Sequence, residues 1–423
     1  MPPDLVIRNV RRRGAPQIVD VAVASGRIVA VGADLPQVGA EELDGAGALL
    51  LPGFVCGHLH LDKAMLADEL RPASWHGDRQ ALRAVNERQR ETFTEEDLLA
   101  RAAQAVELAI SHGTTHLRAF TDVEPVAGLL GTRALVELRR RYAAEIDIQV
   151  AVHPQDLIFA ARDNSELLAA AAREGADVIG GMPSEERTPQ LVQRHVDFVL
   201  DLAKQHGCAV HMFVDDSDDP ADRALEYLAW RTIQEGMQGR VTAGHCGAMS
   251  AYDDAHARRV IGLVAEAGIT ICVNSHISLN LRGRLDRGLV RRGTTRVAEL
   301  AAAGVNLMAA QDDLDNPFYP LGRGDPLEVA HYAAHVLQLL WPEQLEDVFD
   351  MVTVNGARAL GVERYGTEVG DDANLVLLAH PTLREALAAM PPPRAVISKG
   401  VVRAEHEIRS VRRRAVGEPL TTS

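Results

Sequence analysis

Cysteine is scarce in this sequence of 423 residues, and its four cysteines form no CxxC pair. They stand far apart, at Cys56, Cys208, Cys246 and Cys272. Such spacing argues against a disulfide framework and favours reduced thiols, so we expect a cytoplasmic protein.

Long hydrophobic runs are also missing. No run reaches the roughly 20 apolar residues of a transmembrane helix, and the first residues, MPPDLVIRNVRRR, lack the apolar core of a signal peptide. Repeats of solenoid length and low-complexity tracts are absent as well. We therefore expect no membrane partner.

Basic residues are outnumbered, since 44 Lys and Arg stand against 59 Asp and Glu and give a net charge of −15. No basic block offsets this excess, which argues against nucleic acid or an anionic membrane as partner. The simplest explanation of the excess of acidic residues is that a net charge keeps the protein soluble. With 47% hydrophobic and 24% charged residues, the composition is that of a globular protein long enough to bury a sizeable core.

The middle of the chain alternates short apolar runs with helical patterns. The runs are GFVCGHLH, TTHLRAF, IDIQVAV, ADVIGGM, CAVHMFV, RVTAGH, ITICVNS and VNLMAAQ. Between most of them lie amphipathic stretches such as EEDLLARAAQAVELAISHG. Eight strands that alternate with helices predict an α/β fold, a (β/α)8 TIM barrel.

The two ends have a different texture, with strand-like runs such as DLVIRNVRR near the start and ANLVLLAH near the end. We expect them to pair into one small β-sandwich domain. The predicted division is 1–52 and 366–423 for the sandwich and 53–365 for the barrel. The segment 64–95 is longer than a tight loop, and we expect it to cover the barrel mouth.

Polar residues fall at the predicted carboxyl ends of several barrel strands, where side chains of such barrels form the active site. The first strand ends in His58 and His60, whose i, i+2 spacing places both imidazoles on one side. The others are His153, Gln155, His245, Asp312 and Asp313. Each has an ordinary structural explanation, but their coincidence at one end favours a metal site, and two imidazoles with a carboxylate suit zinc or iron(II).

Four stretches, PGFVCGHLHLDKA, VTAGHCGAMS, DDLDNPFYPLG and GDDANLVLL, resemble the amidohydrolase superfamily. The similarity is strongest to its cytosine deaminase-like, or N-isopropylammelide amidohydrolase-like, branch. The resemblance implies one divalent cation held by His58, His60 and Asp312. It also implies that His245 helps to activate water, and that substrate is bound by Gln155, Asp313 and Phe318, the last replacing a more usual tryptophan.

Strand five departs from this family pattern in HMFVDDSDDP. Phe213 stands where relatives carry a metal-binding histidine, and Asp216 stands where they carry a proton-shuttling glutamate. Strand two departs similarly, with Phe120 in place of a histidine. The shorter Asp216 must come closer to its proton to act as general acid and base, and Asp215 competes for that role.

Three interpretations of strand five remain open. His211 supplies the missing imidazole, although it lies about 6–7 Å deeper along a regular strand and would need a bulge. Alternatively, the three other ligands keep the metal and His245 or Asp216 becomes a fourth, which we favour. In the third interpretation the metal is lost and the pocket only binds.

We therefore predict a hydrolase of carbon–nitrogen bonds other than peptide bonds. The expected reaction is hydrolytic deamination of a nitrogen-containing small molecule with a cytosine-like or triazine-like ring, in which Asp216, His245 and Asp312 are catalytic. An amide or cyclic-imide hydrolase and a metal-free binding protein are the alternatives. The sequence leaves open the ring system, the choice of zinc or iron, and whether the chain forms a homo-oligomer.

Overall fold

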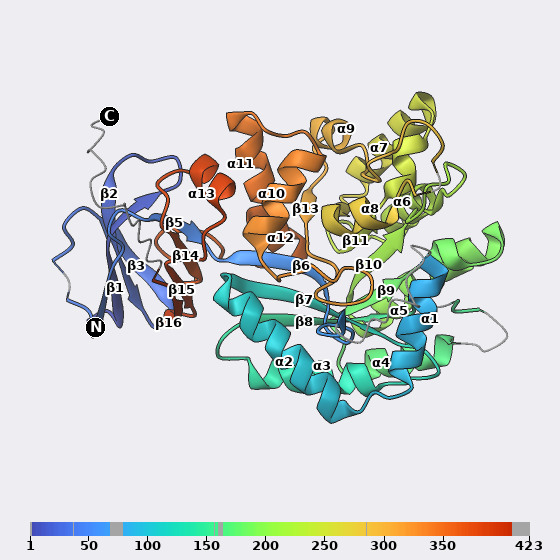
Figure 1. The fold of residues 1–423 in the computed structure, drawn as a ribbon, viewed down its shortest axis with the longest axis horizontal. Coiled ribbons are helices and arrows are strands. Elements are labelled where there is room, and N and C mark those ends of the chain that lie inside the picture. The colour runs from blue at the N-terminus through green and yellow to red at the C-terminus, as the bar shows by residue number, and fades with distance from the viewer. Residues whose placement is uncertain are drawn as a thin grey trace, which may run out of the picture.

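The fold consists of a parallel barrel and a separate mixed sheet that lies beside it (Figure 1). The structure is a computed structural model that describes residues 2–36, 38–67, 79–155, 157–159, 164–284 and 286–407. The predicted (β/α)8 barrel with a small terminal β-domain is confirmed.

The barrel strands follow one another in sequence order, and every hydrogen-bonded neighbour is parallel. They are β6 (Phe54–His60), β7 (Thr114–Asp122), β8 (Asp147–His153), β9 (Val178–Gly181), β10 (Ala209–Val214), β11 (Val241–His245), β12 (Thr270–Val273) and β13 (Leu307–Ala309). All eight apolar runs of the sequence therefore form the predicted strands.

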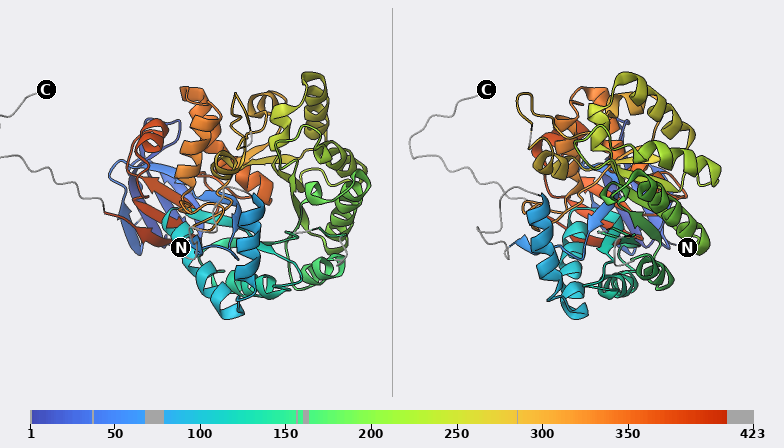
Figure 2. Two further views of the ribbon diagram at one scale, coloured as in Figure 1. Left: turned by 45° about the vertical axis from the view of Figure 1, so that its right-hand side comes forward. Right: turned by 90° about the vertical axis from the view of Figure 1, so that its right-hand side faces the viewer.

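Helices surround the barrel, as the two rotated views show (Figure 2). They are α1 (Arg79–Arg90), α2 (Glu95–Ser111), α3 (Leu130–Arg141), α4 (Ser165–Arg173), α5 (Pro189–His206), α6 (Ala224–Gln234), α7 (Asp254–Glu266), α8 (Ser275–Leu281), α9 (Val297–Ala302), α10 (Pro326–Val336), α11 (Pro342–Met351) and α12 (Val354–Leu360). A further helix, α13 (Leu383–Ala389), lies next to the mixed sheet and contacts α10 and α11 (Figure 1). Two short 3-10 helices are η3 (Pro183–Glu185) and η4 (Gly247–Ala251).

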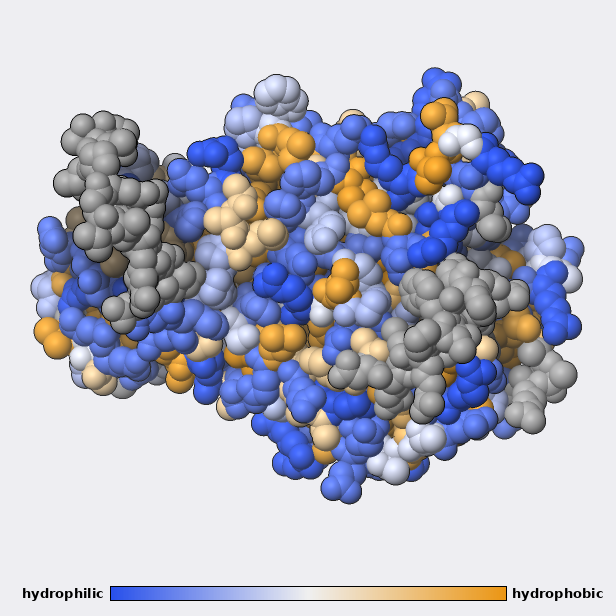
Figure 3. Space-filling view, in the orientation of Figure 1, coloured by the Kyte–Doolittle hydropathy of each residue, from blue (hydrophilic) through white to orange (hydrophobic). Residues whose placement is uncertain are grey.

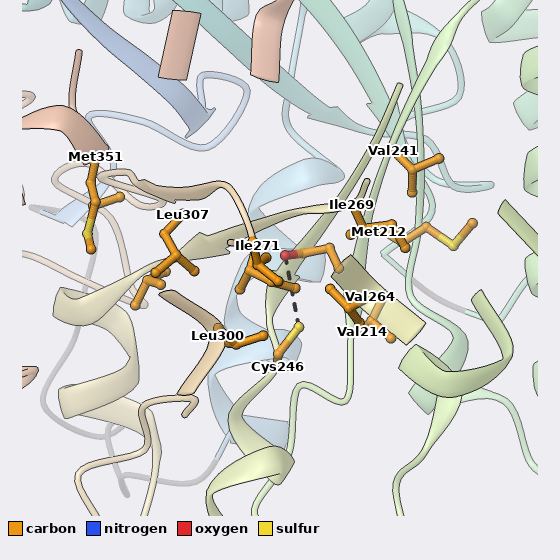
Figure 4. Close-up of a cluster of buried hydrophobic side chains, with 14 of the residues drawn as sticks. Met212, Val214, Val241, Cys246, Val264, Ile269, Ile271, Leu300, Leu307 and Met351 are labelled. Atoms are coloured by element: carbon orange, nitrogen blue, oxygen red, sulfur yellow. Dashed lines mark hydrogen bonds between the residues drawn. The ribbon is translucent and has the colours of Figure 1, made fainter. Parts of the chain in front are cut away.

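The main core lies between the strands and these helices. In Figure 4, Met212 and Val214 of β10 and Ile271 of β12 lie near Val264 of α7 and Leu300 of α9. A second apolar cluster contains Ala102, Ala105 and Val106 of α2. The helices bury one face by amphipathic periodicity. In α2, for example, the buried residues recur at helical spacing, and Thr94 caps the N-terminus by accepting a hydrogen bond from the Asp97 amide.

The mixed sheet joins the two ends of the chain. Its strands are β1 (Leu5–Arg12), β2 (Ile18–Ala24), β3 (Arg27–Gly32), β4 (Glu41–Asp44), β5 (Leu49–Pro52), β14 (Leu375–Leu378), β15 (Ala395–Ser398) and β16 (Val401–Glu405). The antiparallel pair of β5 and β14 unites the N- and C-terminal segments. The exact domain boundaries at 52 and 366 stay a prediction.

Of the segment 64–95, residues 68–78 lie outside the described part of the chain, so the expected cover over the barrel mouth is untested there. Polar side chains occupy much of the face seen in Figure 3, and apolar ones form small groups between them. Among the residues that the structure describes, no helix has both the length and the apolar character needed to cross a bilayer.

Candidate active site

Closure of the barrel brings His58, His60 and Asp312 together. The His60 amide donates to the Asp312 carbonyl at 2.8 Å, and the Asp312 amide donates to the His58 carbonyl at 2.9 Å. These bonds join β6 to the residues that follow β13. Asp312 Oδ1 consequently lies 3.3 Å from His58 Nε2 and 3.6 Å from His60 Nε2. Residues 254 positions apart in the sequence thus form one compact cluster, and all three side chains are buried.

His245 joins this cluster from the end of β11. Its Nε2 lies 3.6 Å from Asp312 Oδ2, and its Nδ1 lies 3.5 Å from Asp216 Oδ1. Asn274 donates to Asp312 Oδ2 at 3.0 Å and thereby holds the second carboxylate oxygen. His245 and Asp312 have φ values of 66° and 70°, a left-handed conformation that non-glycine residues seldom adopt outside turns and functional sites.

The charge states of the cluster suit cation binding. Burial lowers the pKa of His58 and, still more, that of His60, so both imidazoles are neutral near pH 7. Burial by itself raises the pKa of Asp312. The nearby His58 and His245 have a larger opposite effect, so the pKa of Asp312 lies below its ordinary value. Two neutral imidazoles and one carboxylate therefore face one another.

Behind His60 lies a group of charged residues that the sequence analysis did not single out. His60 Nδ1 faces Asp122 Oδ1 at 3.8 Å and Asp62 Oδ1 at 4.0 Å. Lys63 Nζ lies 3.2 Å from Asp122 Oδ2, and Arg90 pairs with the same oxygen. Lys63 directly follows the LHLD stretch of the quoted motif, which is the one sequence signal that pointed to this group.

Behind His58 lies a different arrangement. His211 Nε2 is 3.1 Å from His58 Nδ1, and Arg118 donates to His211 Nδ1 at 3.2 Å. Strand β10 pairs with β9 and β11 without a register shift, so the bulge required for His211 to join the metal ligands is not seen. His211 instead contacts the ring nitrogen of His58 that points away from Asp312.

Phe213 occupies the wall of the site between the imidazoles. Its ring centroid lies 4.7 Å from that of His58 and 5.1 Å from that of His245. It also stacks on His153 at 4.1 Å, and Phe120 stacks on His58 at 4.3 Å. Strand five therefore presents a hydrocarbon face at the position where the resemblance implies a ligand.

A pocket that is open to solvent lies over this cluster. Its lining comprises His60, Lys63, Gln155, Met182, Phe213, Asp216, His245, Ile277, Leu281, Asp312, Asp313 and Phe318. All three predicted substrate-binding residues are thus in the pocket, together with His245 and Asp216. Gln155 accepts from Lys63 at 3.1 Å, which turns the carbonyl end of its amide towards the lysine.

Asp313 and Phe318 are held by the loop after β13. Asn316 donates to Asp313 Oδ1 at 2.5 Å, and the Phe318 amide donates to Asn316 Oδ1 at 2.9 Å. Burial and the adjacent Asp312 raise the pKa of Asp313 to about 7. Asp313 can therefore either donate or accept a proton near neutral pH.

The two candidate carboxylates of strand five have different surroundings. Asp216 lines the pocket and pairs with Arg282, which follows α8. Asp215 instead accepts from the amides of Ala224 and Leu225 at the start of α6, and from the Tyr252 hydroxyl at 2.6 Å. Asp215 therefore anchors a helix, which leaves Asp216 as the carboxylate at the pocket.

Comparisons with known proteins agree with this fold. Residues 77–404 match the amidohydrolase family model. The chain is 27% identical to N-isopropylammelide isopropyl amidohydrolase of Pseudomonas sp. over 96% of this chain and 98% of that protein. It is 30% identical to pterin deaminase of Rhizobium rhizogenes over 90% of this chain and 87% of that protein.

Among solved structures, 5-methylcytosine deaminase from Klebsiella pneumoniae, liganded with 5-fluorocytosine, superposes with a TM-score of 0.91. The two sequences are 32% identical, and the match covers 96% of this chain and 99% of the deaminase chain. These relatives are enzymes named for hydrolysis at carbon–nitrogen bonds, as the predicted enzyme class requires. The chain belongs to the amidohydrolase family.

Proposed function

We propose that the protein is a metal-dependent hydrolytic deaminase of a nitrogen heterocycle. The observation that carries this proposal is the convergence of His58 Nε2 and His60 Nε2 on Asp312 Oδ1, beside the pocket that His60 and Asp312 line. The names of the relatives support the reaction class, since they include deaminases of cytosine-like and pterin rings and a hydrolase of an alkylated triazine.

The residues present fit a divalent cation. One ligand atom from each of His58, His60 and Asp312 lies within 4.8 Å of the others, and His58 Nε2 has no hydrogen-bond partner in the described part of the chain. Two nitrogens and one oxygen are a donor set that suits zinc or iron(II). We infer that these three residues hold the cation, with His245 or Asp216 as the candidate fourth ligand.

A cation bound there would supply Lewis acidity, which makes water nucleophilic near neutral pH. In the proposed reaction, the water oxygen forms a bond to the ring carbon and the bond from that carbon to the exocyclic nitrogen breaks. His245, between Asp216 and Asp312, orients the water and accepts its proton. Asp216, whose Oδ1 lies 3.5 Å from His245 Nδ1, receives a proton from His245 and passes it to the departing amine. For this transfer it must exchange its contact with Arg282 for one with substrate.

The pocket walls favour a flat ring. Phe213 and Phe318 provide apolar surfaces, while Gln155 and Asp313 provide polar atoms that can pair with the edge of a heterocycle. Because Asp313 has a pKa of about 7, it can match either a ring nitrogen or a ring N–H group. A cytoplasmic location remains a prediction from the four cysteines, which are all free and buried.

The proposal is tested by assaying protein purified without chelator, then stripped and reloaded with zinc or iron(II). Cytosine, 5-methylcytosine, pterin and alkylated aminotriazines are the first probes, and released ammonia or amine is the readout. We expect turnover that is lost in Asp312→Asn and after metal removal. Turnover that persists without metal would contradict the proposal.

The proposed function has two alternatives. One is an amide or cyclic-imide hydrolase that uses the same site, and the other is a metal-free binding protein, which Phe213 at the expected ligand position suggests. The same assay with amides and cyclic imides as additional probes tests the first alternative. An amide or cyclic-imide hydrolase would release acid from these compounds and no ammonia from the deaminase probes. A metal-free binding protein would retain no stoichiometric zinc or iron even after reconstitution.

A further inference from the structure

A continuous chain of buried polar contacts runs from Arg118 through His211 to His58 and Asp312. The links are 3.2 Å from Arg118 to His211 Nδ1, 3.1 Å from His211 Nε2 to His58 Nδ1, and 3.3 Å from His58 Nε2 to Asp312 Oδ1. All four residues are at most 2% exposed. Water therefore does not compete for the contacts among Arg118, His211 and His58.

The direction of the first bond is fixed. A guanidinium carries five N–H donors and no acceptor, and Arg118 remains charged although burial lowers its pKa to about 10. Its other donors are engaged with the Gln149 side chain, the Thr242 hydroxyl and the Ala359 carbonyl. Arg118 consequently cannot turn away, and His211 Nδ1 must accept.

This direction propagates along the chain. An imidazole that accepts at Nδ1 is neutral and carries its proton at Nε2, so His211 donates to His58 Nδ1. His58 then accepts at Nδ1 and carries its own proton at Nε2, where it faces Asp312 Oδ1 at 3.3 Å. A protonated Nε2 has no lone pair for a cation.

His60 has the opposite polarity. Its Nδ1 faces the carboxylates of Asp62 and Asp122, which only accept when ionised. That environment favours a proton on Nδ1 and leaves the Nε2 lone pair directed at the Asp312 side. A carboxylate behind a histidine is the usual support for a metal ligand.

We propose that Arg118 and His211 hold His58 in its Nε2–H form, and that this lowers the affinity of the site for divalent cations. Arg118 and His211 are positioning residues, and the proposal rests on the metal site of the proposed function. For His58 to bind a cation through Nε2, its proton must move to Nδ1. His211 must then accept at Nε2 and carry its proton at Nδ1. The Nδ1–H group of His211 would then face an N–H group of Arg118, with no acceptor between them.

The hydrogen placement is tested on metal-free protein by nitrogen-15 NMR of labelled histidines, with His58→Gln identifying the His58 signals. We expect a proton on Nε2 and an acceptor shift on Nδ1 of His58, and the reverse for His60. A proton on Nδ1 of His58 would overturn the proposal. This measurement needs neither activity nor metal.

The effect on affinity is tested with two substitutions at one position. Asp in His211→Asp accepts from both Arg118 and His58, so it reverses the polarity, whereas Asn in His211→Asn can accept from Arg118 and still donate to His58. We expect zinc affinity, measured by competition with a chromophoric chelator, to rise about 10- to 100-fold in His211→Asp and to stay near the original value in His211→Asn.

The outcomes separate this proposal from the proposed function. Equal zinc affinity in the original protein and in a folded His211→Asp variant would overturn the role of Arg118 and His211 but leave the metal site standing. If the original protein and both His211 variants failed to bind zinc or cobalt(II), the proposed metal site would be wrong. The NMR result would still decide which nitrogen of His58 carries the proton.

Discussion

The two imidazoles of the HxH pair are alike in sequence and opposite in surroundings. His58 and His60 lie on one strand, both are buried, and both face Asp312. Yet His60 is backed by Asp62 and Asp122, whereas His58 is backed by His211. The comparison teaches that a motif specifies residue types, while the partner on the far nitrogen of each ring decides which atom is free to bind a metal.

Asp122→Asn should give the largest effect, because it leaves Lys63 and Arg90 without the carboxylate that they share behind His60. Breaking a buried ion pair by removing one partner costs about 3–5 kcal/mol. Chemical denaturation measures the free energy of unfolding. The control is Asp147→Asn, whose partially exposed pair with Lys399 should contribute less than about 1 kcal/mol. Equal losses in the two variants would show that the charges behind His60 are not a tight unit.

Alanine substitution of each imidazole compares the two sides directly. We expect His60→Ala to lower zinc affinity by more than about 100-fold, because it removes the ligand with carboxylate support. His58→Ala should lower zinc affinity by no more than about tenfold, because we infer that His58 carries its proton on Nε2, the nitrogen that faces the site. Chelator competition provides the affinities. A larger loss in His58→Ala than in His60→Ala would invert the comparison.

Phe213→His should sharpen the comparison by adding an imidazole near both rings, since the Phe213 centroid lies 4.7 Å from that of His58 and 5.6 Å from that of His60. We expect zinc to bind at least roughly tenfold more tightly, since even an outer hydrogen-bond partner is worth that much. Cobalt(II) absorption reports the change in ligand set. Phe213→Leu, which adds no donor, should leave affinity and spectrum as they are.

Asp215 contacts neither His58 nor His60, so it serves as a reference for the effect of burial on a carboxylate outside the HxH pair. Burial raises its pKa from about 3.9 in unfolded chains to about 7. The folded state therefore binds more protons than the unfolded state between those values, and stability falls as pH rises through this window. Each fully differing proton contributes a slope of about 1.4 kcal/mol per pH unit.

In Asp215→Asn this contribution to the pH slope should disappear, whatever the substitution costs at a single pH. Denaturation between pH 5 and pH 8 measures it, and the slope that remains then belongs to other groups, including Asp62 and Asp313, whose pKa values are also raised by burial. An unchanged slope would show that Asp215 is ionised throughout.

Much of the architecture could be predicted from the sequence, because each strand run is apolar and each helix is amphipathic over a local window. The eight runs became β6 to β13, and the ends paired through β5 and β14. The predicted site residues line one pocket, except His58, which lies buried next to Asp312. They meet because parallel strands of a barrel present their carboxyl ends at one face. Their roles in metal binding and catalysis stay predictions.

The buried cations Lys63, Arg90, Arg118 and Arg282 could not be assigned from the sequence. A single Arg or Lys in a sequence usually occupies a solvent-exposed position. The partner of a buried one is known only from the tertiary structure, which brings distant elements together. Arg118 lies in β7 but finds His211 in β10, 93 positions away. Asp216 likewise meets an arginine that follows α8.

The sequence by itself determined the alternation of strands and helices and the residue types at the strand ends, because these depend on local periodicity. Only the tertiary structure decided what stands behind each ring: carboxylates behind His60, and an imidazole tied to a guanidinium behind His58. The reason is physical, since a hydrogen bond has a direction set by its fixed donors and acceptors, and these come together only when the barrel closes.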